Sequence, residues 1–469
     1  MSDKRILFVA TIGNRDVQLD GAELRPARVE GEKALSIANS EPKRFSLPIL
    51  LPALKAIKQP IERLILIVTD QPEEVGSKHR SSDTLHFGQI IKILLGQQYK
   101  RLGFADKPAE KIEIISISEN PTVLSGLLRE LQKTLTNKFL QWSKSGHKEL
   151  ALCITGGIPT LNSAVMLLAS RVFKSGLKLY RVNDNGLAFP DPVADEFEKQ
   201  DLRSIIQELA GSWSFKSIAM RIEERALDEE PFNQIRVLCQ AMSCRLVFDF
   251  AGALEILSEN FARAGRFMPV FECLLNELAL LNRLDSVENA RVLLIRELLF
   301  NLMFKFRQHE YVDVAGRLFR LLEECTILLL EKLTGKILPF SEDERGYPAF
   351  TAFVESNQPL LDHLSSKKID YRRLNQYTAE HTLQFMIENE DVQEMLRSKI
   401  LEFLYCYKKL ERIKQLRNKS IIAHGFKSIR YEDFPDDFID LMKKLAALIG
   451  IDNFENPAEM LLSKINESI

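Results

Sequence analysis

Short apolar segments alternate with longer amphipathic segments through about the first 185 residues of the chain. The short segments are rich in Ile, Leu and Val and occupy residues 6–10, 64–68, 112–117, 150–154 and 177–182. Runs of this length without polar alternation are typical of strands buried on both faces of a parallel sheet. The segments between them have apolar residues three and four positions apart, as crossover helices do, over 47–57, 85–102, 123–142 and 161–173. This alternation predicts an open, doubly wound α/β domain with a mostly parallel sheet.

The pattern changes near residue 200, after the sequence Phe-Pro-Asp-Pro at residues 189–192. The following residues read as successive amphipathic helices, for example 290–307, 312–333, 392–423 and 437–448. Only 21 glycines and 18 prolines occur in 469 residues, below the usual share of about 12%, which favours long helices. We therefore expect a Rossmann-like α/β domain, a connecting helical segment and a C-terminal helical bundle, over residues 1–200, 201–285 and 286–469.

Composition excludes several classes of protein. With 63 Lys and Arg against 65 Asp and Glu, the net charge is -2, so no global attraction to nucleic acid or to an anionic membrane is expected and any basic site must be local. The six cysteines are scattered singly, without a Cys/His cluster, which predicts no metal site. No apolar run approaches the roughly 18 residues of a membrane span, so we expect a cytoplasmic protein without a membrane segment.

Two loops of the predicted sheet carry small, hydrogen-bonding residues where a strand ends. The first strand runs into residues 11–16 and the fourth into residues 155–162. Glycine lets the backbone approach a ligand closely, and the first turn of the helix after the fourth strand offers free amides to a phosphate. If the two strands are neighbours, both loops converge on one crevice. The candidate ligand-binding residues are Thr11, Gly13, Asn14, Arg15, Thr155, Gly156, Gly157, Thr160 and Asn162.

These loops are neither a dinucleotide fingerprint nor a P-loop, because no G-x-G-x-x-G follows the first strand and no G-x-x-x-x-G-K-[ST] occurs. A purely structural interpretation also stays open. In that interpretation Gly156 and Gly157 make a tight turn and Thr160 caps the helix that follows.

A second candidate site lies near the C-terminus, where Arg417 and His424 are seven residues apart. In a continuous α-helix seven residues correspond to about 700° of rotation, so both side chains would lie on one face. Gly425 would end that helix and leave His424 in the last turn. An Arg and a His without metal ligands suit metal-independent RNA cleavage, with His424 transferring protons, Arg417 stabilising the phosphorane and Asn418 holding the phosphate or the imidazole. The alternative is a solvated helix face with an end-capping histidine.

Together these residues resemble the CARF-HEPN ribonucleases that accompany type III CRISPR systems. The loops at 11–16 and 155–162 are in the places of the two ligand-contacting CARF loops, and residues 416–424 are similar to the HEPN R-x(4 to 6)-H motif in its Arg-Asn form. Residues 311–323 resemble an earlier HEPN helix, and residues 248–253 resemble a segment of the connecting helices.

The resemblance implies that a cyclic oligoadenylate binds across a CARF homodimer and activates cleavage of single-stranded RNA, through 2′-hydroxyl attack, at a composite HEPN dimer site. We expect a ring of four nucleotides as the activator and no other cofactor. Local cations for RNA are available at Lys408, Lys409, Arg412, Lys414, Arg417 and Lys419. A second hypothesis is a non-enzymatic nucleotide sensor whose helical half docks a partner; it requires neither Arg417 nor His424.

Overall fold

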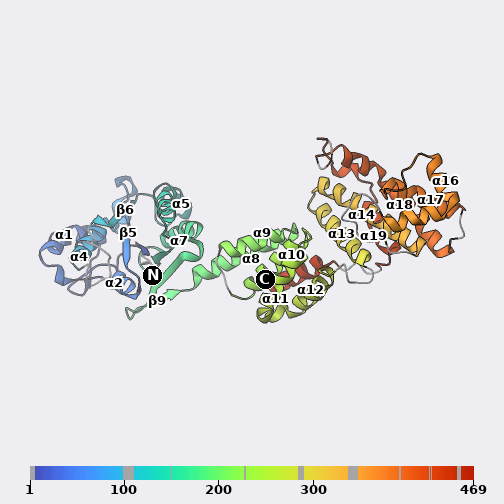
Figure 1. Cartoon of the computed structure of the whole chain (residues 1–469). Helices are drawn as coiled ribbons and strands as arrows, with labels where there is room; N and C mark the ends of the chain where they lie inside the picture. The colour runs from blue at the N-terminus through green and yellow to red at the C-terminus, as the bar shows by residue number, and fades with distance from the viewer. Residues whose placement is uncertain are drawn as a thin grey trace. The chain divides into compact units, whose positions relative to one another are not determined.

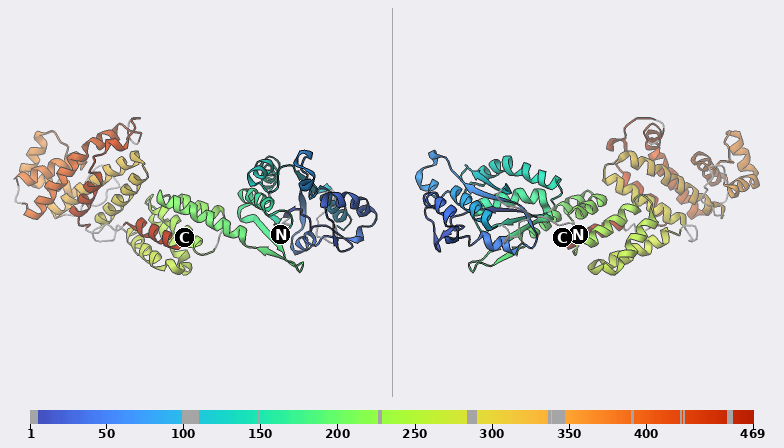
Figure 2. Two further views of the ribbon diagram at one scale, coloured as in Figure 1. Left: turned by 180° about the vertical axis from the view of Figure 1, so that it is seen from behind. Right: turned by 60° about the vertical axis from the view of Figure 1, so that its left-hand side comes forward.

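The computed structural model describes residues 6–98, 110–147, 149–225, 229–283, 290–335, 338, 347–389, 392–421, 423, 425–451 and 456–469. These residues form two compact units (Figures 1 and 2). The first unit contains the described residues up to Ser204 together with Arg225, and the second contains Ile205–Glu224 and the described residues that follow. The division lies inside helix α8 (Val193–Gly211), close to the expected boundary at residue 200. The other expected boundary, at residue 285, lies outside the described residues.

The first unit is built on a six-stranded sheet with the order β6-β5-β1-β7-β8-β9. Its strands are β1 (Ile6–Thr11), β5 (Ile61–Thr69), β6 (Ile112–Ile117), β7 (Leu150–Cys153), β8 (Leu177–Val182) and β9 (Ala188–Asp191). The first five are the predicted strands, and they pair in parallel. Strand β9 was not predicted: it pairs antiparallel with β8 at the sheet edge, where Pro190 is tolerated because an edge strand leaves one row of amides unpaired.

Alternate residues of each central strand face opposite sides of the sheet, and both sides are buried. In β1, Ile6, Phe8 and Ala10 join one hydrophobic core, while Leu7 and Val9 join the other. The first core is covered by α1 (Ala27–Ser40), α2 (Leu50–Ala56) and α4 (Leu85–Gln98). The second is covered by α5 (Leu124–Leu131), α6 (Asn137–Lys144) and α7 (Pro159–Phe173). A sheet with helices on both faces confirms the predicted doubly wound α/β fold.

Several short elements complete the first unit. A π-helical turn, Gln132–Thr136, lies between α5 and α6, in the segment expected as one helix. A small antiparallel sheet joins β2 (Gln18–Leu19), β3 (Ala22–Glu23) and β4 (Phe45–Ser46), and α3 (Ser77–Arg80) precedes α4.

The second unit is helical, as predicted. Its helices after α8 are α9 (Phe215–Glu224), α10 (Phe232–Arg245), α11 (Phe250–Asn260), α12 (Met268–Leu281), α13 (Ala290–Arg307), α14 (Tyr311–Thr334), α15 (Pro348–Ser356), α16 (Gln358–Ser366), α17 (Gln376–Asn389), α18 (Glu394–Asn418), α19 (Phe438–Leu448) and α20 (Pro457–Ser468). The last helix, α20, returns to pack on α10 and α12 (Figure 1).

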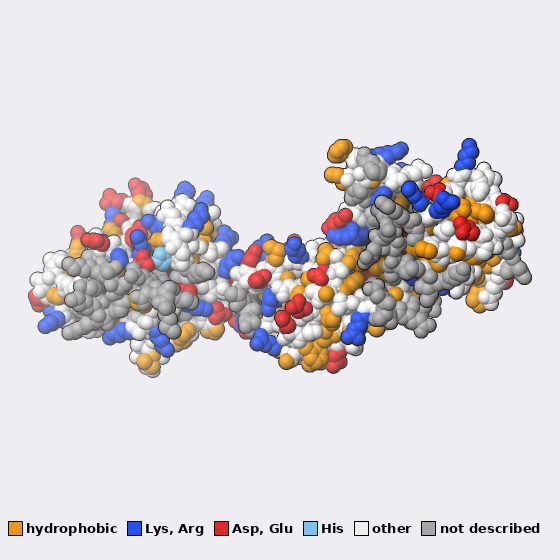
Figure 3. All heavy atoms as spheres, viewed as in Figure 1, with side chains coloured by type: hydrophobic (Ala, Val, Ile, Leu, Met, Phe, Trp, Pro, Cys, Tyr) orange, Lys and Arg blue, Asp and Glu red, His pale blue; other side chains and the backbone are white. Residues whose placement is uncertain are grey.

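Surface composition agrees with the near-neutral net charge. On the face shown in Figure 3, Lys and Arg side chains are interspersed with Asp and Glu side chains. Among the described helices, none is both long and apolar enough to span a membrane.

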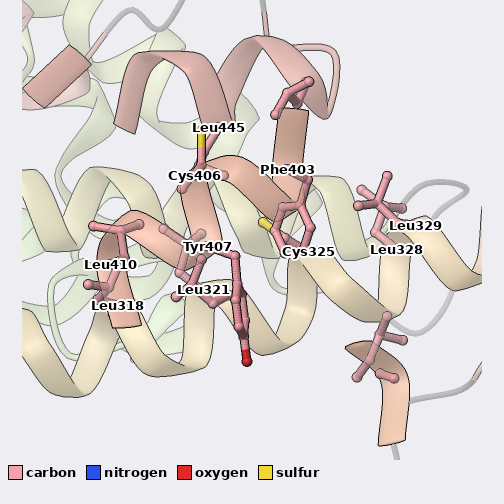
Figure 4. Packing of buried hydrophobic residues seen from close by; sticks show 14 of the residues in the cluster. Leu318, Leu321, Cys325, Leu328, Leu329, Phe403, Cys406, Tyr407, Leu410 and Leu445 are labelled. Carbon is pink, nitrogen blue, oxygen red and sulfur yellow. The ribbon is translucent and has the colours of Figure 1, made fainter. Parts of the chain in front are cut away.

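The core of the C-terminal bundle lies between α14 and α18 (Figure 4). Leu318 and Leu321 of α14 face Phe403, Tyr407 and Leu410 of α18, and all five are 5% exposed or less. Their spacing of three and four residues places them on one side of each helix. This contact fixes α18, and with it the start of the candidate motif at residue 416, against the helix that resembles an earlier HEPN helix.

Candidate functional sites

The two candidate loops of the α/β unit meet at the carboxyl ends of β1 and β7, which are neighbours in the sheet. The chain builds β5 and β6 on one side of β1 and then crosses to place β7 and β8 on the other, so the strand order reverses here. A cavity of about 270 Å³ opens between the loops. It is lined by Ile12, Gly13, Asn14, Arg15, Asp16, Arg25, Ile49, Thr69, Ser82, Thr84, Thr155, Gly156, Gly157, Ile158 and Leu161.

The glycines let the two loops interlock. A Cβ atom on Gly13 would lie 2.7 Å from the amide nitrogen of Gly157, and one on Gly157 would lie 2.5 Å from the Thr11 hydroxyl. Gly157 also has a φ of +68°, a conformation that other residues adopt at a cost. Any side chain at these positions would separate the loops, so the glycines have a structural reason as well as a place at the cavity.

Thr11 and Asn162 do not line the cavity; their buried side chains hold the two loops together through hydrogen bonds. Both side chains are buried. The Thr11 hydroxyl is hydrogen-bonded to the Asn162 side chain and donates to the Gly156 carbonyl at 2.9 Å. The Asn162 amide donates to the carbonyls of Ile154 and Gly156 at 2.9 and 2.7 Å. With every polar atom engaged inside the protein, these two residues support the pocket walls.

The remaining candidates divide between the cavity wall and the adjacent helix. Asn14 and exposed Arg15 line the cavity. Thr155 also lines it, while its hydroxyl accepts a hydrogen bond from the Val182 amide at 2.7 Å. Thr160 lies half-buried in the first turn of α7 and does not line the cavity. No described side chain forms a capping hydrogen bond at the start of this helix, so Thr160 does not cap it.

Sequence reasoning missed several lining residues, of which Arg25 is the most informative. Arg25 is exposed at the cavity and forms an ion pair with Glu23 at 2.6 Å. Together with Arg15 it gives the cavity two cations, which suits an anionic ligand. Arg25 follows the short strand β3 and belongs to no motif, so no local signal in the sequence assigns it to this site.

Asp16 is the one acid among the described residues that line the cavity, and it is buried. Its carboxylate accepts a hydrogen bond from the Gly13 amide at 2.7 Å. Burial raises its pKa from the ordinary value to about 7, against the opposing effects of the Gly13 amide, the Arg15 charge and the Gly157 amide. A neutral, protonated Asp16 removes a negative charge from the place where an anionic ligand would bind.

The raised pKa of Asp16 predicts a pH-dependent stability of the α/β unit. Between about pH 4 and pH 7 the folded state keeps a proton that the unfolded state has lost, so the free energy of unfolding falls as pH rises through this window. The full loss corresponds to about 4 kcal/mol for a pKa of about 7. Chemical unfolding of the wild type and of Asp16→Asn, measured at pH 4.5 and pH 7.5, should show a larger fall in the free energy of unfolding in the wild type than in the variant. Parallel pH profiles for the two proteins would contradict it.

The candidate site near the C-terminus differs from its predicted geometry. Helix α18 ends at Asn418, not beyond residue 423, so the argument from seven residues of continuous helix is wrong. Ser420 ends the helix: its amide and its hydroxyl both donate to the Arg417 carbonyl, at 3.0 and 2.8 Å, and its side chain is buried. In a continuing helix that carbonyl would accept from residue 421.

Gly425 also has a different role from the predicted one. The chain turns after Ser420, so that Gly425 donates to the Ser420 carbonyl at 3.1 Å and Lys427 donates to the Lys419 carbonyl at 2.9 Å. A Cβ atom on Gly425 would collide with the Lys419 carbonyl. Glycine is required at position 425 because the backbone here passes close to the backbone of Lys419. This position is seven residues beyond the end of α18, so Gly425 does not end that helix.

The Arg417 side chain is held by its own bundle. It is half-buried in the last turn of α18. Its guanidinium carbon lies 4.4 Å from the ring centroid of Phe319 of α14, and one terminal nitrogen donates to the Asn418 side chain at 3.1 Å. Stacking on an aromatic face fixes the guanidinium plane while leaving its edge free to donate. His424 lies outside the described residues, so the distance between the two predicted catalytic groups is not part of this geometry.

The predicted basic residues around Arg417 are only partly available. Lys409 pairs with Asp437 at 2.6 Å, and Arg412 pairs with Asp433 at 3.0 Å. Lys414 lies over the Tyr407 ring, 3.7 Å from its centroid, and donates to its hydroxyl. Lys408 and Lys419 are exposed. Within the described part of the chain, no group of three or more His, Cys, Asp or Glu side chains is placed to hold a metal ion.

Comparison with known proteins agrees with this architecture. Residues 283–448 match the family model described as the Csm6 HEPN domain, a range that begins before α13, ends with α19 and includes Arg417 and Asn418. Among solved structures, the chain is similar to Enterococcus italicus Csm6 bound to cyclic hexa-2'-fluoro-hexa-dAMP, with a TM-score of 0.63 and 13% identity over 99% of this chain and 100% of that chain. No curated protein matches the chain in sequence.

Proposed function

We propose that this chain is a CARF-HEPN protein of a type III CRISPR system, that it is an endoribonuclease activated by a cyclic oligoadenylate, and that it cleaves single-stranded RNA without a metal ion. The position of the Arg417 side chain is the observation that supports this proposal most directly. It lies within the matched HEPN range, at the end of a helix, with its guanidinium held against Phe319. A non-enzymatic role would not need this arrangement.

In the proposed chemistry His424 takes the proton from a ribose 2′-hydroxyl, and the oxygen attacks the adjacent phosphorus. The new O2′–P bond forms as the P–O5′ bond breaks, and the leaving 5′-oxygen receives a proton from an imidazole, which a second copy of His424 in a homodimer would supply. Arg417 donates to the phosphorane oxygens as charge develops on them. Asn418, which accepts from Arg417, orients the guanidinium or contacts the phosphate.

The loop cavity of the α/β unit is the proposed activator site. At about 270 Å³ it is near the lower limit of pockets that hold small ligands, so it suits one nucleotide of a ring rather than a whole ring. Two such pockets in a homodimer would share one cyclic ligand. The ring of four expected from the sequence stays a prediction, and because the Enterococcus italicus Csm6 structure contains a ring of six, the test uses both rings.

Activation also requires that the connecting helices act on the HEPN bundle, and a buried polar contact within the second unit supports this step. The Asn301 side chain of α13 is buried; it donates to the Leu246 carbonyl after α10 at 2.7 Å and accepts from Arg317 of α14 at 2.5 Å. Arg317 is two residues before Phe319 on the same helix. Because breaking buried hydrogen bonds is costly, a shift of the connecting helices would move α14 and the ring on which Arg417 rests.

The deciding experiment is cleavage of a labelled single-stranded RNA, with and without rings of four and six adenylates. We expect cleavage to rise with one of the rings. The non-enzymatic sensor would bind a ring and cleave nothing, so ligand binding without cleavage would favour that alternative. Such an enzyme would meet foreign RNA in the cytoplasm, where we expect it to act.

Cleavage is expected to survive chelation. Neither Arg417 nor His424 needs a metal to stabilise the phosphorane or to transfer a proton. The rate in excess EDTA should equal the rate in Mg²⁺ after correction for ionic strength. A requirement for a divalent ion that Mg²⁺ restores would contradict the proposed chemistry.

A further inference from the structure

A surface of the C-terminal bundle outside the candidate catalytic site combines exposed rings with cations. It consists of Tyr377, His381 and His363 together with Lys367, Lys368, Arg372 and Arg373, and we call it the α16–α17 surface. Tyr377 is 58% exposed, and its ring meets the His381 ring edge-on with centroids 4.5 Å apart. The His363 ring lies 6.3 Å from His381. Of these three adjacent rings, that of Tyr377 is open to solvent, so a flat ligand could stack on it.

The cations of this surface are exposed, and most of them form no ion pair with a described carboxylate. Lys367, Lys368 and Arg372 form no ion pair among the described residues, and Arg373 approaches Asp370 only at 3.9 Å, with both side chains well exposed. Elsewhere on the bundle, cations such as Lys409 and Arg412 are paired with carboxylates. In a chain with a net charge of -2, four exposed cations within residues 367–373, next in sequence to an exposed ring, are a local basic site of the kind that binds a phosphate backbone.

Contacts between α17 and α18 connect this surface to the candidate catalytic residue. Tyr377, Glu380 and His381 are spaced three and four residues apart, so they share one face of α17. The Glu380 carboxylate lies near Tyr407 of α18, where burial, together with the charge of this carboxylate, raises the pKa of the Tyr407 hydroxyl, and it attracts the Lys414 ammonium. Lys414 precedes Arg417 by three residues, which is about one helical turn. Tyr377 and His381 thus lie on a helix that packs against α18, the helix that carries Arg417.

We propose that the α16–α17 surface binds single-stranded RNA beside the cleavage site, with a base on Tyr377 and backbone phosphates on the four cations. Stacking on an aromatic ring is available to any base, whereas an acidic protein would use the cations and leave the rings unexplained. The inference rests on the proposed ribonuclease function and adds to it a site that holds nucleotides outside the scissile bond.

The test compares a short RNA, which fills only the cleavage site, with a long one that also reaches the surface. The full-length chain with its activator is assayed on RNAs of about four and about twenty nucleotides. We expect Tyr377→Ala to lower kcat/KM about tenfold on the long RNA and to leave the short RNA unaffected, while Tyr377→Phe keeps the wild-type rate on both. Lys367→Gln combined with Arg372→Gln should lower the salt dependence of KM for the long RNA, by about 0.7 in the log–log slope for each phosphate lost.

Lys133→Gln combined with Lys144→Gln, two exposed lysines of the α/β unit, removes the same charge and should change neither substrate. An equal loss on both RNAs, or no loss on either, would overturn the inference. Failure of the proposed function has a different result: the wild type would cleave neither RNA, or Arg417→Ala would cleave both normally.

Discussion

Replacing Arg417 or His424 by Ala is expected to abolish RNA cleavage while leaving activator binding intact. Loss of a general acid or base typically costs 10² to 10⁴-fold, so His424→Ala should lose at least about a hundredfold. Arg417→Ala should lose a similar amount, because removing a group that donates to a developing oxyanion costs about 10² to 10³-fold. Initial rates at saturating RNA and activator would measure both effects.

The matched control for Arg417 is Arg412→Ala on the same helix. Arg412 is well exposed, with 70% of its side chain accessible, and among the described residues it pairs with Asp433, so its removal should change the rate little. Arg417 is half-buried on Phe319, and unfolding curves would show whether the loss of packing, rather than of chemistry, accounts for the result. Near-normal cleavage by both Arg417→Ala and His424→Ala would exclude this site.

The fold could be predicted from periodicity because each central strand is a short apolar run. Residues such as Phe8 and Val9 are adjacent in sequence and buried in opposite cores, as is typical of a strand in a sheet covered on both faces. Strand β9 escaped prediction because Ala188–Asp191 has neither an apolar run nor an alternation and contains a proline. It forms through pairing with β8, and pairing partners are not visible in a local pattern.

The positions of the candidate sites could be predicted from the sequence, but the contacts of their side chains could not. The convergence of the two loops was predicted on the condition that their strands are neighbours, and the strand order of the sheet, with β1 beside β7, meets that condition. The contact between Thr11 and Asn162 joins residues far apart in sequence. Both residues were predicted to contact the ligand, whereas in the structure their side chains hold the loops together. The end of α18 depends on the buried Ser420 side chain, and burial of one serine depends on tertiary packing that no spacing rule contains.

These contacts change which variants test the activator pocket. Gly157→Arg would weaken activation, but a side chain there collides with Thr11, so the loops would separate and the α/β unit would lose stability. Asn162→Ala would remove the hydrogen bonds of this side chain to the Thr11 hydroxyl and to the carbonyls of Ile154 and Gly156, which hold the two loops together. Both variants are expected to weaken activation, and neither distinguishes ligand contact from loop architecture.

Arg15→Ala makes that distinction and is expected to raise the activator concentration for half-maximal cleavage by about tenfold or more. The side chain is exposed at the cavity, so its removal should leave the loops in place, while a charge-assisted hydrogen bond to a phosphate is worth about 1.5–3 kcal/mol. Cleavage without activator should stay at the wild-type level, because a ligand acts only through its difference in affinity between resting and active states.

Arg129→Ala, an exposed arginine on α5 outside the cavity, is the control for a general effect of charge on the α/β unit. Activator titrations of the three proteins, each followed by RNA cleavage, give the comparison directly. A half-maximal concentration for Arg15→Ala equal to that of Arg129→Ala and the wild type would mean that the interlocked glycines form a structural turn. The sensory site would then lie elsewhere on the α/β unit.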